Sequence, residues 1–543
     1  MKSSELFVKC LEHEGVEFIF GVPGEENLDV MDSLLDSPIQ FVTTRHEQGA
    51  AFMADVYGRL TGKAGVCLST LGPGATNLLT GVADANMDHG PLVAIAGQAD
   101  TERLHKESHQ VVSLYRMFDE VTKYSTRILS ANVINEIVRK AFKVATTEKT
   151  GACFIEFPEN LAKVEVDAKP IPIKVSVLPE PDSGRIEAIV KLLDHAKTPI
   201  ILAGNGVIRS AACEALVAFA EKLNIPVANT FMAKGVMPFR HPLSLGSVGL
   251  QANDYTNVGL SQADLIICVG YDLVEYHPKL WHPTGDRIII HVDTTHSEVD
   301  TFYPVTAGVV ANIAYSLNKL GTLAKPHQAH GMHVLREALI EEMIQHSNDT
   351  EFPVKPQKII WDLRTALASD DIVICDVGAH KMWMARMYRC DNPNTCIISN
   401  GFASMGIALP GAIAAKLAYP EKKIVAVTGD AGFLMNAQEI ETAVRLKLAI
   451  VVLIWNDSAY GLIEWKQLNQ FGRTSSVTFN NPDFVKYAES FGAKGIHITK
   501  AEDLLPKIKQ ALVDNVLTII DCPVDYRENL KLTEKLGDMV ASL

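Results

Sequence analysis

Two aspartates, Asp430 and Asp457, have the sequence context of a metal and phosphate site. Asp430 lies in the turn Gly429-Asp430-Ala431-Gly432 after a β-rich run, and Asp457 follows a second such run. The residues between them are predicted to form a right-handed crossover that connects two parallel strands. Both carboxylates would then lie at the same carboxyl edge of a sheet, where α/β folds bind their ligands.

A cation would relieve the repulsion between two facing carboxylates. At a separation of about 4 Å they would repel by roughly 4 kcal/mol at an effective dielectric constant near 20. Their oxygen atoms favour magnesium or calcium, and magnesium commonly takes substrate phosphates as further ligands. The backbone NH groups of Ala431 and Gly432 are predicted to bind phosphate oxygens at the helix start. The alternative is that Asp430 is only a turn residue and Asp457 only a loop residue.

Further candidate residues lie near the N-terminus. Glu47 follows a predicted strand and precedes a helix that is expected to begin near Gly49. A glutamate in this position can also be an ordinary acid that the helix dipole favours. The segment Gly72-Pro73-Gly74, between a strand and a helix, indicates close approach of the backbone to a ligand.

Three α/β units are predicted to position these residues. Strand-like runs alternate with helical patterns, residues 164–184 form a proline-rich connector, and the pattern breaks again between residues 320 and 356. We therefore expect an α/β fold with three doubly wound parallel-sheet domains, over residues 1–165, 185–322 and 354–543. The predicted strands cover residues 18–24, 40–47, 64–71, 91–98 and 151–158, then 198–204, 263–270 and 287–293, and finally 372–378, 422–429, 449–456 and 518–524.

Two local patterns add detail to these units. Asn436, with Glu439 three residues later, predicts a capped helix start within the crossover. The run Gly204-Asn205-Gly206 is similar to the start of a dinucleotide-binding turn, but Arg209 occupies the place of the third glycine. A plain tight turn is the interpretation that we prefer there.

Length, charge and composition argue against several kinds of binding partner and several kinds of protein. The 543 residues are too many for one core, and the net charge of −14 argues against nucleic acid or an anionic membrane surface as a partner. No window approaches the roughly 18 apolar residues of a membrane helix. Because Glu5, Glu12 and Glu14 interrupt any secretory signal, we expect a cytoplasmic protein. The nine scattered cysteines are expected to be reduced and mostly buried, without disulfides or a zinc site.

The crossover resembles the thiamine diphosphate enzymes, whose signature is a Gly-Asp-Gly turn followed, after a strand, by an Asn-Asn pair. Gly429, Asp430 and Asn456 match that signature, whereas Ala431 and Asp457 replace the second glycine and the second asparagine. The resemblance implies that Asp430, Asp457 and the main-chain oxygen of Ala459 bind Mg²⁺. The two departures are expected to weaken cofactor affinity, although the added carboxylate should hold the cation more strongly.

The N-terminal segments 45–48 (RHEQ) and 72–77 (GPGATN) are similar to the pyrimidine-binding domain of the same family. The resemblance implies that Glu47 hydrogen-bonds the aminopyrimidine ring and promotes loss of the thiazolium C2 proton. In the family this domain faces the diphosphate-binding domain of another subunit. A homodimer or homotetramer with sites at the subunit interfaces is therefore expected.

The resemblance also assigns the other site residues. Met405 would support the bent cofactor from beneath, although a methionine is also a common core residue. Gln98 is a candidate for contact with the acceptor substrate, whereas the alternative is a solvated strand end. The cofactor-binding residues implied are Gly24, Pro73, Asn77, Gly378, Ala379, His380, Ala403, Met405, Gly429, Asp430, Ala431, Gly432, Asp457 and Tyr460.

Within the family, residues 270–281 (GYDLVEYHPKLW) and 521–530 (DCPVDYRENL) are most similar to acetolactate synthases of the catabolic type. The biosynthetic type carries an Arg-Phe-Asp-Asp-Arg run where this chain has residues 271–275, so FAD is doubtful. The implied reaction decarboxylates pyruvate and condenses the product with a second pyruvate, which gives 2-acetolactate and CO₂. Another 2-oxoacid decarboxylase or carboligase, an FAD-linked pyruvate oxidase, a non-catalytic cofactor sensor and a nicotinamide dehydrogenase remain alternatives.

Overall fold

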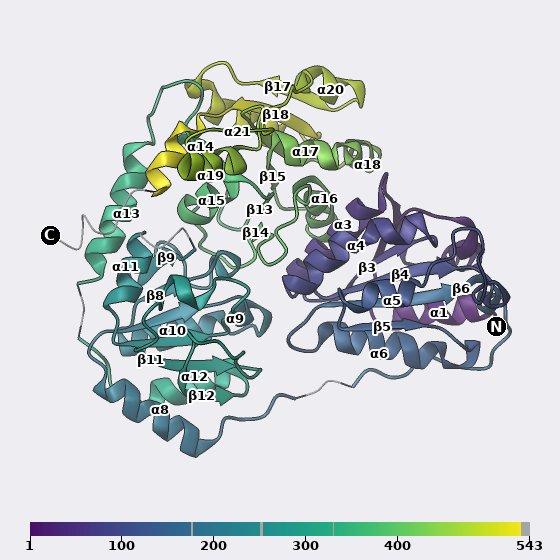
Figure 1. Cartoon of the computed structure of the whole chain (residues 1–543), viewed down its shortest axis with the longest axis horizontal. Coiled ribbons are helices and arrows are strands. Elements are labelled where there is room, and N and C mark those ends of the chain that lie inside the picture. Colours follow the sequence, from purple (N-terminus) through teal and green to yellow (C-terminus); the bar gives the residue numbers. More distant parts are fainter. Residues whose placement is uncertain (175–176, 250–253, 329–330, 534–543) are drawn as a thin grey trace.

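The strands of the protein form three sheets of six strands, and all neighbouring strands within a sheet run parallel (Figure 1). The computed structural model describes residues 1–174, 177–249, 254–328 and 331–533. Helices alternate with the strands along the chain. The predicted α/β fold with three parallel sheets is confirmed, while the domain boundaries stay predictions and residues 534–543 of the third domain lie outside the described part.

The first sheet has the strand order β2-β1-β3-β4-β6-β5. Its central strands β4 and β6 are buried along their whole length, as expected for apolar runs that are covered on both faces. Its strands are β1 (Phe18–Gly21), β2 (Gln40–Thr43), β3 (Gly65–Ser69), β4 (Leu92–Gln98), β5 (Tyr124–Arg127) and β6 (Ala152–Pro158). The helices are α1 (Ser3–His13), α2 (Leu28–Leu34), α3 (Glu47–Thr61), α4 (Pro73–Met87), α5 (Leu114–Asp119), α6 (Ile134–Thr146) and α7 (Glu159–Ala162).

The second sheet has the order β12-β11-β10-β7-β8-β9. Read from β9, this is the doubly wound order 3-2-1-4-5-6, with its switch point between β7 and β10. Its strands are β7 (Pro199–Ala203), β8 (Val227–Asn229), β9 (Ser244–Ser247), β10 (Leu265–Val269), β11 (Ile288–Asp293) and β12 (Val305–Val310). The helices are α8 (Ser183–His195), α9 (Gly206–Arg209), α10 (Cys213–Leu223), α11 (Tyr255–Gln262) and α12 (Ile313–Leu323), followed by α13 (His333–Gln345).

The third sheet has the order β14-β13-β15-β16-β18-β17, which repeats the order of the first sheet strand for strand. Its strands are β13 (Ile372–Cys375), β14 (Cys396–Ile398), β15 (Ile424–Gly429), β16 (Val451–Asn456), β17 (Lys494–His497) and β18 (Thr518–Pro523). The helices are α14 (Pro356–Ala366), α15 (Ala379–Met387), α16 (Ala408–Ala418), α17 (Asp430–Met435), α18 (Ile440–Arg445), α19 (Gly461–Phe471), α20 (Phe484–Ser490) and α21 (Leu504–Val513).

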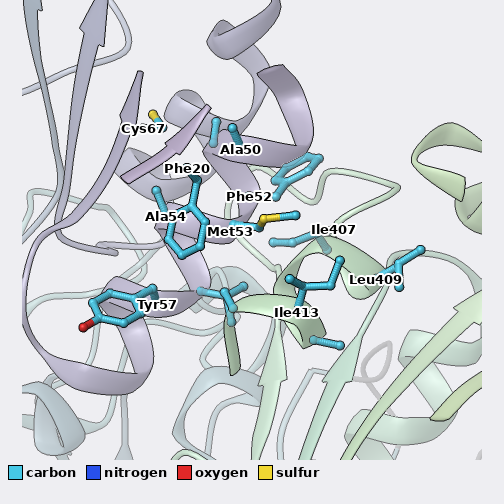
Figure 2. Close-up of a cluster of buried hydrophobic side chains, with 14 of the residues drawn as sticks. Phe20, Ala50, Phe52, Met53, Ala54, Tyr57, Cys67, Ile407, Leu409 and Ile413 are labelled. Atoms are coloured by element: carbon cyan, nitrogen blue, oxygen red, sulfur yellow. The ribbon is translucent and has the colours of Figure 1, made fainter. Parts of the chain in front are cut away.

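The first and third domains share a hydrophobic core. Phe52 and Met53 of α3 belong to the same buried cluster as Ile407, Leu409 and Ile413 at the start of α16 (Figure 2). Burial of apolar area contributes roughly 25 cal/mol per Å², so this shared core fixes the two domains against each other. The start of α3, where Glu47 lies, is thereby placed next to the third domain.

The sequence patterns missed the strands β5, β8, β9, β12, β14 and β17. Five of the six lie at a sheet edge, and β8 lies next to one. The strands β5, β12 and β17 are partly exposed, and β8, β9 and β14 have only three or four residues, so they lack the long apolar run of a central strand. The pattern also missed α13, which lies inside the predicted break between residues 320 and 356.

The predicted cap at Asn436 is wrong. The side chain of Asn436 makes no capping hydrogen bond, and the next α-helix, α18, begins only at Ile440. Asn436 instead donates to Gln48 Oε1 at 3.0 Å. Glu439 accepts from the backbone NH of Arg45 at 3.0 Å. Both side chains form hydrogen bonds between the third and the first domain. Local sequence rules do not predict such contacts.

Two further expectations concern the whole chain. All nine cysteines are free, and every one except Cys213 is buried, as predicted. Among the described residues, no helix has the length and apolar character needed to cross a bilayer.

Candidate active site

The carboxyl edge of the third sheet contains a cavity of about 180 Å³. It lies where β13, β15 and β16 end and where α15, α17 and α19 begin, at Ala379, Asp430 and Gly461. The predicted site residues that line it are Gly378, Ala379, His380, Ala403, Met405, Gly429, Asp430, Ala431, Gly432, Asp457, Ala459 and Tyr460. It is also lined by Val377, Gly461, Leu462, Ile463 and Tyr526, which the sequence did not single out.

Asp430 and Asp457 lie together at this edge. Asp430 is the first residue of α17, and its carboxylate accepts the backbone NH of Ala431 at 2.8 Å and of Ser458 at 2.7 Å. Burial raises the pKa of Asp430 above its usual value. Burial and the nearby charge of Asp430 raise the pKa of Asp457 to about 8. A cation would stabilise the charged forms of both acids, so this carboxylate pair fits a divalent metal ion.

A third polar side chain, Asn481, completes this cluster. Its Nδ2 donates to Asp430 Oδ2 at 2.7 Å and to Asn456 Oδ1 at 3.0 Å. Its own Oδ1 is buried and has no hydrogen-bond partner among the described residues. Asn481 lies in the segment between α19 and α20, where no sequence signal points to the site. In the described part of the chain, no group of three or more His, Cys, Asp or Glu could hold a metal ion, so other oxygen atoms, from the main chain, amide side chains, water or a bound phosphate, would complete any coordination here.

His380 supplies another polar atom of the cavity lining. Its ring is buried, and its Nε2 has no hydrogen-bond partner among the described residues. Burial lowers the pKa of His380 to about 3. A Cβ atom on Gly378 would lie 2.8 Å from this ring, so the glycine leaves room for the imidazole. In the tautomer that carries its proton on Nε2, this unpaired nitrogen can donate a hydrogen bond to an anionic group.

Asp376, at the end of β13, holds the loop that carries Met405. Its carboxylate accepts the backbone NH of Gly406 at 2.8 Å and that of Ala408 at 3.2 Å. It also accepts the hydroxyl of Thr428 at 3.3 Å, directly before the Gly429-Asp430 turn. Asp376 therefore connects the Met405 loop and the Gly429-Asp430 turn. The sequence marked this residue only as the end of a strand.

The first domain contributes a separate group of predicted residues. Glu47 is the first residue of α3, which begins two residues before the predicted start, and Pro73 is the first residue of α4. Asn77 Nδ2 donates to Glu47 Oε2 at 2.9 Å. Gly24 lies so close to Thr70 that a Cβ atom would overlap it. None of these residues lines the cavity at the third sheet. Within one copy of the chain, the residues predicted to bind the pyrimidine ring and those predicted to bind the diphosphate therefore do not line the same cavity.

Gln98 is fully buried at the end of β4. Its Nε2 donates to Glu156 Oε1 at 2.6 Å and to the main-chain oxygen of Val112 at 3.0 Å. The expected alternative, a solvated glutamine, is therefore wrong. Contact of Gln98 with an acceptor substrate stays a prediction.

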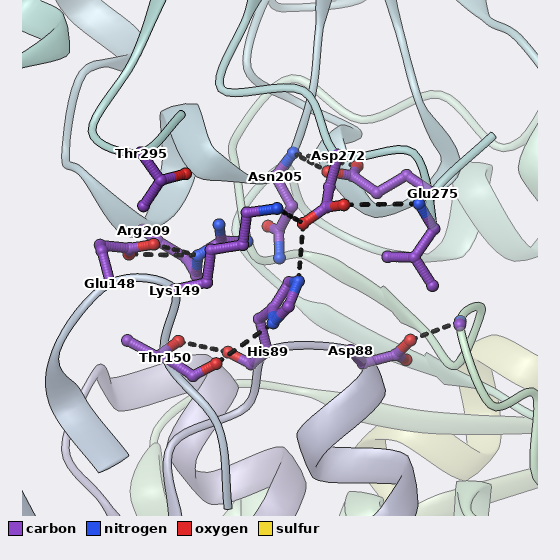
Figure 3. Close-up of polar contacts among 12 residues, drawn as sticks. Asp88, His89, Glu148, Lys149, Thr150, Asn205, Arg209, Asp272, Glu275 and Thr295 are labelled. Carbon is purple, nitrogen blue, oxygen red and sulfur yellow. Dashed lines mark hydrogen bonds and ion pairs between the residues drawn. The ribbon is translucent and has the colours of Figure 1, made fainter. Parts of the chain in front are cut away.

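Acidic side chains of the protein itself occupy part of the carboxyl edge of the second sheet (Figure 3). Both carboxylate oxygens of Glu275 lie 3.0 Å from the backbone nitrogen of Asn205, in the glycine turn after β7. Asp272 binds His89 and Lys149, each at 2.7 Å. The preferred interpretation of residues 204–206 as a tight turn agrees with this packing, because Glu275 takes the backbone NH that a phosphate would need.

Arg209 also has an internal partner in this region. Its guanidinium lies 3.1 Å from Glu148, on the segment that follows α6 (Figure 3). The residue that replaces the third glycine of the dinucleotide pattern therefore connects the first and second domains.

Three sequence families cover most of the chain. Residues 1–117 match the thiamine pyrophosphate enzyme N-terminal TPP binding domain, and residues 186–320 match the thiamine pyrophosphate enzyme central domain. Residues 376–522 match the thiamine pyrophosphate enzyme C-terminal TPP binding domain, which includes every predicted residue of the cavity. Thiamine pyrophosphate is another name for thiamine diphosphate.

Individual proteins match along nearly the whole chain. An acetolactate synthase of Bacillus subtilis is 36% identical over 99% of this chain and 97% of its own length. A probable acetolactate synthase large subunit of Methanocaldococcus jannaschii is 35% identical over 99% of this chain and 94% of its own. A catabolic acetolactate synthase of Raoultella terrigena is 34% identical over 98% of this chain and 97% of its own.

Proposed function

Since the chain belongs to the thiamine pyrophosphate enzymes, we propose that it is an acetolactate synthase that converts two molecules of pyruvate into 2-acetolactate and CO₂. The observation that carries this proposal is the 36% identity to an acetolactate synthase over 99% of the chain. The arrangement of the cavity at the third sheet is in keeping with it, because a carboxylate pair and an unpaired histidine nitrogen line the same space.

The cavity residues suit the diphosphate end of the cofactor. Asp430, Asp457 and the main-chain oxygen of Ala459 would hold Mg²⁺, which cancels the repulsion between the two carboxylates. The backbone NH of Gly432 and the ring of His380 would bind phosphate oxygens. When bound, thiamine diphosphate supplies the nucleophilic carbon and the electron sink that decarboxylation and condensation require.

Other residues of the chain position and isolate the reacting end. Met405 would support the cofactor from beneath, on the loop that Asp376 fixes through the NH of Gly406. Leu462 and Ile463 give the cavity an apolar wall that helps to exclude water. Glu47 would exchange a proton with the aminopyrimidine ring, and Asn77 orients its carboxylate through the hydrogen bond to Oε2.

A second copy of the chain is part of this proposal. Glu47 lies outside the cavity of its own third domain, so a partner subunit would supply the glutamate, as the family resemblance implies. The protein would therefore act as a homodimer or homotetramer. FAD has no role in the proposed reaction, and Glu275 already occupies the backbone NH at the glycine turn of the second domain.

The test is a product assay. The purified protein is incubated with pyruvate, Mg²⁺ and thiamine diphosphate, and 2-acetolactate and acetaldehyde are both quantified. We expect 2-acetolactate as the main product, with loss of the activity when either Mg²⁺ or the cofactor is withheld. Acetaldehyde as the main product would show a decarboxylase instead, and absence of both products would refute the proposal.

A further inference from the structure

A second cavity, of about 480 Å³, lies between the second and third domains and shares no lining residue with the cofactor cavity. It is formed by α13, α14 and the segments around Phe239 and Arg389. Four arginines line it, and we call it the arginine groove: Arg240, Arg336, Arg364 and Arg389. Its volume is in the range of about 300–1,000 Å³ that small-molecule sites have.

The arginine groove contains more positive charge than its own acids neutralise. Asp391 is the one acid that lines it, and this carboxylate lies 3.5 Å from the guanidinium of Arg240. Glu342, on the adjoining helix α13, is already paired with Arg386. In a chain with a net charge of −14, such a local excess of guanidinium groups is unexpected.

None of the other three arginines forms an ion pair with a residue that the structure describes. Arg336 donates to the main-chain oxygen of Phe239 at 2.8 Å, and its Nη1 is buried without a partner among the described residues. Arg364 donates to the Tyr388 hydroxyl at 2.9 Å and to the main-chain oxygen of Leu367 at 2.7 Å.

Arg389 forms no hydrogen bond or ion pair with any residue that the structure describes. Burial lowers the pKa of both Arg336 and Arg389. The neighbouring charge of Arg364 lowers that of Arg389 further, and the charge of Asp391 offsets only part of this decrease. Each of these two guanidinium groups would therefore be stabilised by an anion in the groove.

Aromatic rings hold three of the guanidinium groups in place. The Arg389 guanidinium lies 4.3 Å from the centre of the Trp361 ring, and that of Arg336 lies 5.2 Å from the Phe239 ring. Arg364 stacks on Tyr388 in the same way, at 5.2 Å. Stacking fixes the plane of a guanidinium. The NH groups of Arg389 and the Nη1 of Arg336 remain available, whereas both Nη atoms of Arg364 already donate within the protein. A planar fork of NH donors matches a phosphate in a bidentate manner, so the groove is preorganised for phosphoryl groups.

The groove also has an apolar side. Ile340, Met343 and Ile344 of α13 line it together with Trp361. A bare phosphate would leave this surface in water, whereas an organic anion would cover it. We propose that the arginine groove binds a phosphate-bearing organic anion of the nucleoside diphosphate class, at a site separate from the cofactor cavity.

The test measures binding to the protein saturated with thiamine diphosphate and Mg²⁺, so that the cofactor cavity is filled. Titration calorimetry with ADP and with inorganic diphosphate gives two affinities for each variant. We expect Arg389→Gln to bind ADP at least about tenfold more weakly than the unchanged protein, because one charged hydrogen-bonding partner is lost. Arg389→Lys, which keeps the charge, should lose less.

The matched control is Arg185→Gln, which removes the same charge from an exposed position on α8, outside the groove. It should bind ADP as the unchanged protein does. Should Arg389→Gln fail to fold, Arg240→Gln replaces it, because that side chain is 75% exposed. Unchanged thermal unfolding and unchanged acetolactate formation identify a folded variant.

Three outcomes would overturn the proposal. The first is that the unchanged protein binds neither ADP nor inorganic diphosphate. The second is that Arg389→Gln and Arg185→Gln bind ADP equally well. The third is equal affinity for ADP and inorganic diphosphate, which would mean that the apolar side contributes nothing and that the ligand is a simple anion. Tighter binding of ADP, lost only in the groove variants, supports it.

Discussion

The first and third sheets have the same strand order but carry different groups at their carboxyl edges. In both sheets, a side-chain amide at the end of the fourth strand along the chain donates to an acid on the sixth strand along the chain, which is its neighbour in the sheet. Gln98 binds Glu156 at 2.6 Å in the first sheet, and Asn456 binds Asp521 at 2.9 Å in the third. The shared scaffold therefore extends to a polar pair inside the sheet.

The two sheets differ in the residues that come directly after the third strand. After β15 the chain continues with Asp430, a buried carboxylate at the start of α17. After β3 it continues with residues 70–72 and the start of α4 at Pro73. This turn leaves its backbone open to a ligand but carries no charged side chain. The acid of the first domain is Glu47, which comes after β2 instead. Under the proposed function, one topology would thus serve both for a metal and diphosphate site and for a proton-exchanging carboxylate, because function depends on side chains placed at the sheet edge.

The largest effect is expected from the acid of the first domain. Glu47→Gln keeps the shape and the hydrogen bond from Asn77 but removes the exchangeable proton. Acetolactate formation should fall by about 10²–10⁴-fold, the usual contribution of a general acid–base group. Cofactor binding, measured by calorimetry, should change little.

The matched control for Glu47 is Glu136→Gln. Glu136 is an exposed acid in the first turn of α6 in the same domain, so it tests the helix-dipole role by itself. It should retain full activity. If Glu47→Gln and Glu136→Gln were equally active, Glu47 would have no catalytic role and would be only an acid that the helix dipole favours.

The next effect concerns the acid of the third domain. Asp430→Ala should weaken Mg²⁺-dependent binding of thiamine diphosphate by more than about 100-fold, since loss of even a supporting partner of a metal ligand costs about 10–100-fold. Calorimetry with and without Mg²⁺ measures it. The control Asp370→Ala, at an exposed position of the same domain, should bind normally. Cofactor affinity that is independent of Mg²⁺ in Asp430→Ala would contradict the ligand assignment.

The last prediction compares the acids on β6 and β18, which are Glu156 and Asp521. Glu156 is fully buried and also pairs with Arg127 at 2.9 Å, so Glu156→Gln leaves that cation without its partner. The free energy of unfolding should fall by about 3–5 kcal/mol. Asp521 has a half-exposed histidine, His497, as its charged partner, and Asp521→Asn should cost only about 1 kcal/mol. Urea unfolding measures both, and equal losses would show that the two pairs are equivalent.

Much of the site was accessible to sequence reasoning because it lies within single turns. The run from Gly429 to Gly432 and the residues after β16 are local features, and the cavity contains them all. Asn481 was missed because it approaches Asp430 from a segment that no motif marks. The pair Asn436 and Glu439 was misread as a helix cap because both side chains bind the first domain instead.

The sequence by itself determined the α/β class, the parallel sheets and the family, because apolar runs and glycine turns are local and periodic. Only the tertiary structure decided which side chains distant in sequence meet: Glu275 against the turn at Asn205 within the second domain, and four arginines in one groove between the second and third domains. Such contacts depend on the order in which strands join a sheet and on how the sheets pack. No spacing along the chain records that order.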